Sequence, residues 1–433
     1  MNKICFSVFL SISLVAFAAE PQGNNIFNVR DFGSKGDGTT LDTGAIQKAF
    51  DACGKAGPGT VKFSRGVYLS KPLTIRNSNT TILLEEGATL LASPVTSDFL
   101  KQGGDWLKAK SGGDFIPFLS GTDLSNITVD GKGTIDGNGK IWWPEAEKAR
   151  QIKEGYTLPR PNLFVLTRCK NVRVSGVHLI NSPKFHFVPT DCVDVAITGI
   201  TIIAPEGAAN TDGIDPSNCR QVKITRCTID TGDDNIAIKS SGAVQGREFA
   251  CEDIEVTDCV FKHGHGMSIG SETVGGVRNV TVKRCTFEDT DNGLRIKSRR
   301  ERGGIVENVT YSDITMSNVH PAISIVAYYQ ASTHAKYPKD DKAQPVTPTT
   351  PAFRNIRITN VTGNSATEAG LIVGLPESPV QNVVLENVHL SAKAALTVAH
   401  ARDIQLTNSR FVVSEGEPVI LDDAQVEGVA SAK

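Results

Sequence analysis

Two adjacent aspartates stand out in the stretch TIDTGDDNIAIKS, which runs from Thr228 to Ser240. Asp233 and Asp234 come directly before isoleucines at alternate positions, a spacing that predicts a strand. Adjacent carboxylates repel each other and lower strand propensity, so their place at the start of a strand indicates a chemical role. Two carboxyl groups near one bond can serve as proton donor and proton acceptor in its hydrolysis.

Further polar residues fall into register with this pair when neighbouring segments are aligned. The segments NTDGIDPS, GDDNIAIKS, HGHGMSIGS, DNGLRIKS and PAISIVAYY share one inward apolar column: Ile214, Ile236, Met267, Leu294 and Ile323. The outward columns beside it are Asp212, Asp234, His265 and Asn292; Asp215, Ala237, Ser268 and Arg295; and Ser217, Lys239, Gly270 and Lys297. Parallel strands lie about 4.8 Å apart, so these side chains form one compact patch, which Asp233 approaches from the preceding turn.

This patch has a structural and a functional interpretation. Asx side chains cap turns and stack in β-solenoids, and an aspartate column alone would favour the structural one. Three carboxylates with a histidine, an arginine and a lysine within three rungs favour function, because like charges this close cost stability. Crowding raises the pKa of one carboxyl group, while Arg295 and Lys297 suit a carboxylate on an acidic sugar. The residue types in this patch therefore predict hydrolysis of a glycosidic bond.

A recurring phrase of strand, turn and strand positions these residues. From Asn171 onward its copies are roughly 21 to 32 residues apart, except for one longer interval that holds a proline-rich loop, and this is solenoid spacing. They begin at Asn171, Asp194, Gln221, Asp253, Asn279, Asn308, Asn355, Asn382 and Asp403, with an earlier copy at Asn126. One coil cannot bury its own apolar face, so coils must stack. The pattern predicts an all-β fold, a parallel β-helix, with the right-handed coil that nearly all parallel crossovers adopt.

The composition limits the classes of protein to which this chain can belong. The chain has 433 residues, 39% hydrophobic content and a formal charge of −2, which supports a large core and does not favour a nucleic-acid partner. Residues 1–19 combine Lys3, an apolar run and a small-residue cleavage site, which predicts a signal peptide before one domain at 20–433. No later run approaches ~20 apolar residues. We therefore expect a secreted or periplasmic monomer with no membrane partner.

The cysteines follow the coil register in two columns. One contains Cys169, Cys192, Cys219 and Cys251, and the other contains Cys227, Cys259 and Cys285. Disulfides are one interpretation for an exported protein, but parallel Cβ vectors fit disulfide geometry poorly, which favours stacked buried thiols. Sites of the Asn-x-Thr type likewise coincide with repeat positions, so the coil pattern explains them better than glycosylation does: Asn126, Asn279, Asn308 and Asn360.

Four short motifs appear in order on consecutive coils: NTDG at 210–213, GDD at 232–234, GHG at 264–266 and RIK at 295–297. Together they resemble the signature of the polygalacturonases, glycoside hydrolase family 28. The longer strings SPKFH, NTDGIDPS, TGDDNIAIKS, GHGMSIGSET and NGLRIKS are most similar to the bacterial endopolygalacturonases, and the resemblance covers nearly the whole mature chain. It implies a pectin-lyase-like β-helix whose first coil is capped by a short helix within FNVRDFGSKGDGTTLDTGAIQKAFDAC.

The resemblance also implies an activity and its catalytic residues. The protein would be an inverting hydrolase of α-1,4-galacturonosyl bonds in polygalacturonate, the backbone of pectin. Asp233 would be the general acid, and Asp212 and Asp234 would hold and deprotonate the water. His265 would tune the protonation of Asp233. An inverting mechanism further requires ~6.5–9.5 Å between the acid and the base.

Substrate contacts follow from the same resemblance. Arg295 and Lys297 would bind galacturonate carboxylates, and we expect the substrate to contact Asn210 and Lys239 as well. The family also places a tyrosine at the site, which matches Tyr329, with Tyr328 as its competitor. The chain departs from the pattern at Val326, where relatives often carry Asp. The resemblance implies no metal and no cofactor.

Several alternatives remain open. An exo-polygalacturonase or another pectic-backbone hydrolase would share these motifs. A pectate-lyase-like β-helix would use calcium and a basic proton acceptor, and an adhesin would bind glycan without turnover. GHG and RIK favour hydrolysis. Endo or exo action depends on loops 98–118, 137–162 and 330–353, in the second of which Trp142 and Trp143 either stack on sugar or pack internally.

Overall fold

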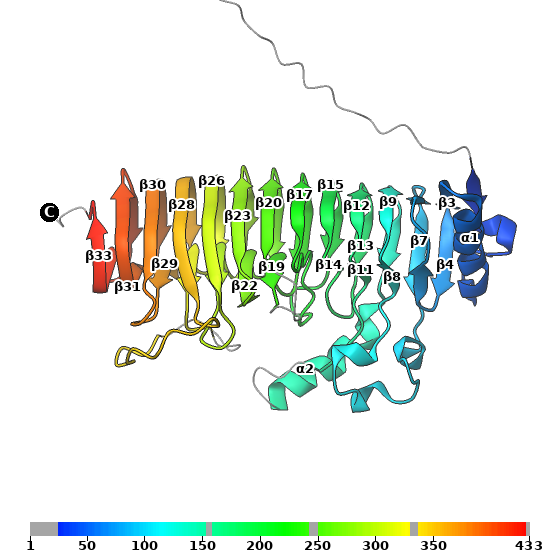
Figure 1. The fold of residues 1–433 in the computed structure, drawn as a ribbon, viewed down its shortest axis with the longest axis horizontal. Helices are drawn as coiled ribbons and strands as arrows, with labels where there is room; N and C mark the ends of the chain where they lie inside the picture. Colours follow the sequence, from blue (N-terminus) through cyan, green and yellow to red (C-terminus); the bar gives the residue numbers. More distant parts are fainter. Residues whose placement is uncertain (1–24, 153–157, 242–249, 330–336, 430–433) are drawn as a thin grey trace, which may run out of the picture.

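Short parallel strands stacked coil upon coil make up almost all of the protein (Figure 1). The structure is a computed structural model that describes residues 25–152, 158–241, 250–329 and 337–429. Each strand pairs with the equivalent strand of the next coil, and every pairing between named strands is parallel in this part of the chain. The architecture is a right-handed parallel β-helix, which confirms the predicted fold. The predicted signal peptide lies outside the described residues.

One ladder of strands carries the predicted catalytic patch, and we call it the site sheet. In stacking order it contains β5 (Leu73–Ile75), β8 (Leu119–Thr122), β11 (Phe164–Thr167), β14 (Phe187–Thr190), β19 (Ile236–Ser240), β22 (Met267–Thr273), β25 (Leu294–Lys297), β27 (Ile323–Val326), β29 (Glu368–Val373), β31 (Ala394–Thr407) and β33 (Val419–Glu427). Between β14 and β19 the ladder continues through single bridges at Ile214 and Ser217.

Two further ladders close the coil. The second contains β1 (Ile26–Asn28), β3 (Gly59–Phe63), β6 (Thr80–Leu84), β9 (Ser125–Gly131), β12 (Lys170–Ser175), β15 (Val193–Thr198), β17 (Arg220–Thr225), β20 (Cys251–Thr257) and β23 (Val277–Lys283). The third contains β2 (Asp37–Leu41), β4 (Gly66–Ser70), β7 (Ala88–Ala92), β10 (Thr134–Asp136), β13 (His178–Ile180), β16 (Thr201–Ile203), β18 (Thr228–Thr231), β21 (Val260–His263), β24 (Thr286–Glu288) and β32 (Arg410–Val413). Three long strands bend through both ladders: β26 (Ile305–Val319), β28 (Ala352–Ser365) and β30 (Val380–Ala392).

Inward side chains of like type stack along the axis and form one continuous core. Phe164 and Phe187 stack with ring centroids 4.8 Å apart, and Phe261 and Phe287 lie at 4.9 Å. Asparagines at repeat positions turn the chain with positive φ and bond to one another between coils, as Asn355 Nδ2 does to Asn308 Oδ1 at 3.2 Å. Only residues with a short polar side chain, besides glycine, adopt this φ readily. The four Asn-x-Thr sites therefore serve the coil, as expected.

The chain ends and excursions differ from the coils. Helix α1 (Thr43–Ala56) caps the first coil by burying Ile46 and Phe50 against it, as predicted. Loop 98–118 and helix α2 (Trp143–Ile152) project from the side of the site sheet toward the N-terminal end, and loop 337–351 projects toward the C-terminal end (Figure 1). The excursions also contain short 3-10 turns: η2 (Thr96–Phe99), η3 (Trp106–Lys108), η4 (Gly112–Asp114) and η5 (Gly139–Ile141), while η1 (Val29–Phe32) precedes α1. No helix among the described residues is long and apolar enough to cross a membrane.

The paired tryptophans hold the excursions together. Trp142 is fully buried and packs edge-on against Trp106 and Phe99, with ring centroids 4.9 and 5.8 Å away. Trp143 donates its indole N–H to the Ser182 carbonyl oxygen at 3.1 Å. Of the two interpretations left open by the sequence, internal packing is therefore the one that the structure supports for Trp142.

The cysteine columns consist of buried free thiols. All eight cysteines of the described residues are buried and unpaired as disulfides, which confirms the favoured interpretation. The thiols donate weak hydrogen bonds to backbone carbonyl oxygens, as Cys219 Sγ does to the Pro189 oxygen at 3.2 Å. A thiol sulfur can also accept one, since the backbone N–H of Cys169 donates to Cys192 Sγ at 3.4 Å. Burial raises the pKa of the Cys251 thiol to about 12, so this group is unreactive while folded.

We expect reductant to leave the thermal unfolding midpoint unchanged, because none of the eight cysteines in the described residues is cross-linked. Alkylation followed by mass spectrometry checks the same point. The folded protein should resist the reagent, whereas protein unfolded without reductant should be modified at all eight of these thiols. A midpoint that falls when reductant is added would contradict the assignment.

Candidate active site

The rungs of the site sheet bring the predicted residues into one patch. Ile214 is bridged to Ile236, Ile236 to Met267, Met267 to Leu294 and Leu294 to Ile323, which is the inward column expected from the sequence. The outward neighbours therefore share one surface of three to four rungs. Asp233 and Asp234 lie in the turn between β18 and β19, and His265 lies in the turn between β21 and β22.

A buried asparagine shapes the turn that holds the two aspartates. Asn235 is fully buried, and its amide donates to the carbonyl oxygens of Ile229 and Lys262 at 3.0 and 3.2 Å. Its Oδ1 accepts the Gly266 N–H at 2.8 Å, which ties the turn of one coil to the next. A buried amide with all its groups bonded is rigid, so Asp233 and Asp234 on its N-terminal side have a fixed direction.

The glycines of the GHG motif are required by close backbone approach. Gly264 and Gly266 both have positive φ, at 61° and 66°. A Cβ on Gly264 would lie 2.4 Å from the Asp233 carbonyl oxygen, and one on Gly266 would lie 2.0 Å from the Asn292 carbonyl oxygen. Only glycine fits at positions 264 and 266. His265 therefore lies between two positions at which the backbones of neighbouring coils are in close contact.

Asp234 is held as a buried anion between cations. Its oxygens accept hydrogen bonds from Lys297 at 2.6 Å and from Arg295 at 3.2 Å, while the Ser268 hydroxyl donates at 2.7 Å. Burial acts to raise the pKa of Asp234, but the charges of Lys297 and Arg295 outweigh it and lower the pKa. The side chain is only 3% exposed, so Asp234 lies in the outward column, as expected, but is enclosed by its partners and not open to water.

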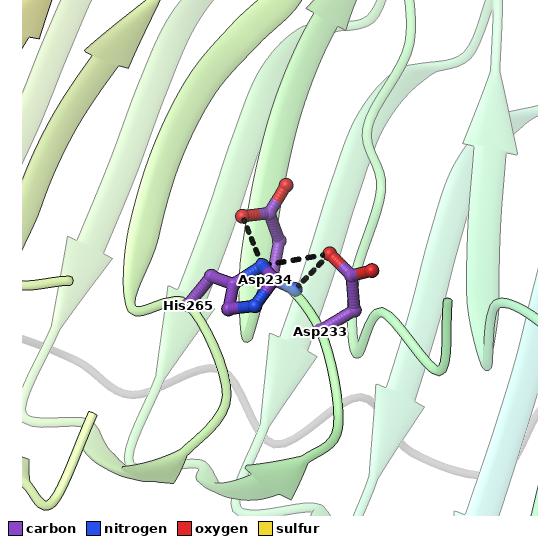
Figure 2. A group of neighbouring side chains, drawn as sticks. All are labelled: Asp233, Asp234 and His265. Carbon is purple, nitrogen blue, oxygen red and sulfur yellow. Dashed lines mark hydrogen bonds and ion pairs between the residues drawn. The ribbon is translucent and has the colours of Figure 1, made fainter. Parts of the chain in front are cut away.

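Asp233 faces His265 from the turn (Figure 2). Its Oδ1 lies 3.0 Å from His265 Nδ1 and accepts the backbone N–H of Asp234 at 2.9 Å. Its Oδ2 accepts the side-chain amide of Asn210 at 3.3 Å. Burial acts to raise the pKa of Asp233, yet the charge and hydrogen bond of His265 reverse this and lower it below its usual range. The second ring nitrogen of His265 lies 3.5 Å from Asp291.

Asp212 forms a second charge group with Asp215 and Lys239. The Lys239 ammonium lies 3.2 Å from Asp212 Oδ2 and also pairs with Asp215. Burial, followed by repulsion from Asp215 and Asp233, raises the pKa of Asp212 well above its usual value. Within the described residues, one oxygen of Asp212 and one of Asp215 have no hydrogen-bond partner. Burial and the neighbouring carboxylates therefore favour the protonated form of Asp212, and Lys239 opposes them.

Two residues that the sequence analysis did not single out support this group. Arg160 is buried and donates to the Ala209 carbonyl oxygen at 2.7 Å and to Asn210 Oδ1 at 3.3 Å. The second contact orients the Asn210 amide so that its NH2 group faces Asp233. His186 contacts the Asp212 carbonyl oxygen through Nδ1 at 3.0 Å, and burial lowers its pKa to about 4, which keeps it neutral. The string SPKFH, which contains His186, was the available signal.

The two tyrosines after β27 point in different directions. The Tyr329 ring lies beside the site cations, with its centroid 5.6 Å from the Arg295 guanidinium and 5.2 Å from the Lys297 ammonium. Tyr328 instead donates its hydroxyl to Asp341 at 2.7 Å and packs on Arg300. Tyr329 is therefore the tyrosine that reaches the patch. Val326 lies one rung beyond Lys297 and is buried in an apolar cluster with Val373 and Ala399.

One group of side chains has ligand atoms close enough for a metal ion. One atom each of Asp233, Asp234 and His265 lies within 4.8 Å of the others, and no other such group occurs among the described residues. Asp234 is already bonded to two cations, so a divalent ion there would face their repulsion. One oxygen of Asp233 and one of Asp234 lie 3.0 and 3.9 Å from His265 Nδ1. The separation of acid and base that inversion requires stays a prediction.

A parallel β-helix with clustered carboxylates, a histidine and two cations on one sheet defines a glycoside hydrolase site, and comparison with known proteins gives its family. Residues 53–409 match the family model described as Glycosyl hydrolases family 28, and the chain belongs to that family. The chain is 38% identical over 316 residues to a protein named endo-polygalacturonase from Pectobacterium carotovorum subsp. carotovorum. That alignment covers 70% of this chain and 76% of the relative.

Solved structures agree with the family. The polygalacturonase from Erwinia carotovora ssp. carotovora is similar with a TM-score of 0.68 and 30% identity, and the match covers 96% of this chain and all of that one. A hyperthermoactive exopolygalacturonase from Thermotoga maritima gives a TM-score of 0.72 at 26% identity, with 93% of each chain covered. The protein is thus an enzyme, a family 28 glycoside hydrolase, and the adhesin alternative is set aside.

The protonation of Asp215 should be measurable as a pH-dependent stability. Burial raises the pKa of Asp215 to about 6, so between pH ~4 and 6 the folded state binds a proton that the unfolded chain releases. This group therefore makes the free energy of unfolding fall as pH rises through that window. Asp215→Asn should remove the effect, and its stability relative to wild type should rise by about 2–3 kcal/mol between pH 4 and 7. Denaturant unfolding at several pH values tests this, with exposed Asp340→Asn as control. Parallel curves for Asp215→Asn and wild type would contradict it.

Proposed function

We propose that the protein is an exported polygalacturonase that hydrolyses α-1,4-galacturonosyl bonds of polygalacturonate within the polymer and inverts the anomeric centre. The observation that carries the proposal is the juxtaposition of the Asp212, Asp233 and Asp234 carboxyl groups with Arg295 and Lys297 on one sheet. Such a site can handle a proton on one side of a bond and a water on the other, beside cations that attract an acidic sugar. The endo-polygalacturonase relative supports the substrate and the endo mode.

In this mechanism Asp233 donates the proton to the leaving oxygen. His265 controls when it can do so. While the imidazole is charged, its hydrogen bond keeps the Asp233 carboxyl group ionised. Without that charge, burial favours the protonated carboxyl group of Asp233.

The water would lie between Asp212 and Asp234. Asp234 stays anionic because Lys297 and Arg295 neutralise it, and Asp212 offers an unbonded oxygen that can accept a hydrogen bond. The ionised member of this pair takes a proton from the water as the water oxygen bonds to the anomeric carbon and the bond to the leaving oxygen breaks. Lys239 pairs with Asp212 and, in this proposal, supports that carboxyl group beside the sugar.

The remaining features of the proposal concern substrate and location. Arg295, Lys297 and Tyr329 would surround the sugar carboxylates, and Asn210 would hold Asp233 and reach the sugar. No cofactor takes part in these steps. We further propose that residues 20–433 are the mature catalytic domain, released as a monomer to the periplasm or the medium after removal of residues 1–19.

A time course on polygalacturonate in the presence of chelator tests the activity. Reducing ends, product sizes and ultraviolet absorbance are followed together. We expect reducing ends to form while the polymer collapses to saturated oligomers. Release of monomer or dimer from an intact polymer would show an exo-enzyme, and unsaturated products would show a lyase and refute hydrolysis.

Substitution of Asp233 and of Asp212 distinguishes the general acid from the residue that activates the water. Asp233→Asn should lower kcat on polygalacturonate by at least about 10²–10⁴-fold, because it removes the general acid, with little change in the unfolding midpoint. An oligogalacturonide with a phenolic leaving group needs little protonation, so the same variant should retain far more activity on it. Asp212→Asn should lose both activities. The opposite pattern would assign the acid to Asp212, in line with its raised pKa.

A further inference from the structure

A half-buried phenylalanine lies next to the catalytic carboxylates. Phe187 is bridged to Ile214, so Phe185, two positions earlier, occupies the outward column one rung before Asp212. The backbone confirms this placement, because the N–H of His186 donates to the Asp212 carbonyl oxygen at 2.8 Å. Neighbouring parallel strands are about 4.8 Å apart, so the Phe185 ring lies within one sugar width of the reacting carboxyl groups.

Two ammonium groups contact this ring. Lys184 Nζ is 4.4 Å from the ring centroid of Phe185, and Lys239 Nζ is 4.2 Å from it. Both Lys184 and Phe185 are only partly buried, so solvent reaches them. One cation on an aromatic face is a common packing contact, and Lys239 already supplies it. A second lysine on the same ring calls for another explanation.

Among the described residues Lys184 has no anionic partner, unlike the two lysines that pair with the catalytic carboxyl groups. Lys239 pairs with Asp212 and Asp215, and Lys297 pairs with Asp234. Within the described residues, by contrast, no carboxylate oxygen comes within 4.0 Å of the Lys184 ammonium.

Its surroundings would favour a bound anion. Burial lowers the pKa of Lys184, and the nearby positive charges of Lys239 and Arg160 lower it further, against the opposing charge of Asp212. A cation in such a place is stabilised by a negatively charged ligand.

We propose that Lys184 and Phe185 form a sugar subsite on the N-terminal side of Asp212, in which the ammonium binds the carboxylate of one galacturonate unit and the ring contacts the face of that sugar. The proposal rests on the proposed function for the class of ligand, since a uronic acid combines an apolar ring face with a carboxylate. It adds a specificity determinant for the acidic form of the polymer over its methyl ester.

Binding of trigalacturonate and of its methyl ester tests the subsite. Calorimetry uses protein carrying Asp233→Asn, so that no bond is cleaved during the titration. In this background Lys184→Met should weaken trigalacturonate binding about tenfold, the loss expected for one hydrogen bond to a charged group, and leave binding of the ester unchanged. Phe185→Leu should weaken both ligands to the same extent, because ring contact does not depend on the sugar's charge.

Two matched variants control for charge and folding. Lys184→Arg should restore most of the affinity for trigalacturonate, and Lys223→Met, at an exposed position of β17, should have no effect on either ligand. Equal weakening of both ligands by Lys184→Met, or no weakening, would overturn the subsite. Failure of the wild type to cleave polygalacturonate would instead refute the proposed function, and the binding series would still decide the role of Lys184.

Discussion

The spacing between parallel strands is the constraint on which the rest of the molecule depends. Coils that repeat at about 4.8 Å place equivalent residues of successive rungs in direct contact. Inside, this stacks aromatic rings, aliphatic chains and free thiols in columns. Outside, it gathers side chains that are far apart in the sequence, such as Asp212 and Lys297, on one small surface. The catalytic patch is therefore a direct product of the coil register, and a slip of one residue in any rung would turn its side chains inward.

Charge compensation across rungs makes this concentration of carboxylates tolerable. Asp234 is balanced by Lys297 and Arg295, which both lie on β25 two coils further along, and Asp212 is balanced by Lys239. The pairing also differentiates the acids, because a carboxyl group between two cations stays ionised while Asp212, which is buried and repelled by neighbouring carboxylates, tends to keep a proton. Carboxyl groups on neighbouring coils can thus differ in how readily they hold a proton, as paired carboxyl chemistry requires.

Rigid turns fix the positions of the catalytic side chains. Asn235 bonds across two coils, and the two glycines beside His265 allow backbone contacts that a side chain would block. Arg160 and His186 act from the preceding coil, where they fix the Asn210 amide and the Asp212 carbonyl. The excursions lie outside this frame and border the site sheet on both sides (Figure 1).

The sequence by itself determined the coil, the inward column and the membership of the patch, because period-2 strands repeat at nearly constant spacing and a register error would bury charges. It also favoured free thiols over disulfides and Tyr329 over Tyr328. Only the tertiary structure decided how the carboxyl groups are protonated and how far apart they lie, since both depend on burial and on partners from other coils. Arg160 shows the limit clearly: it lies on an excursion without repeat register, so no pattern in the chain predicts that it orients Asn210. Whether Trp142 packs or stacks on sugar was likewise settled by contacts with Trp106 and Phe99, which lie in a separate loop.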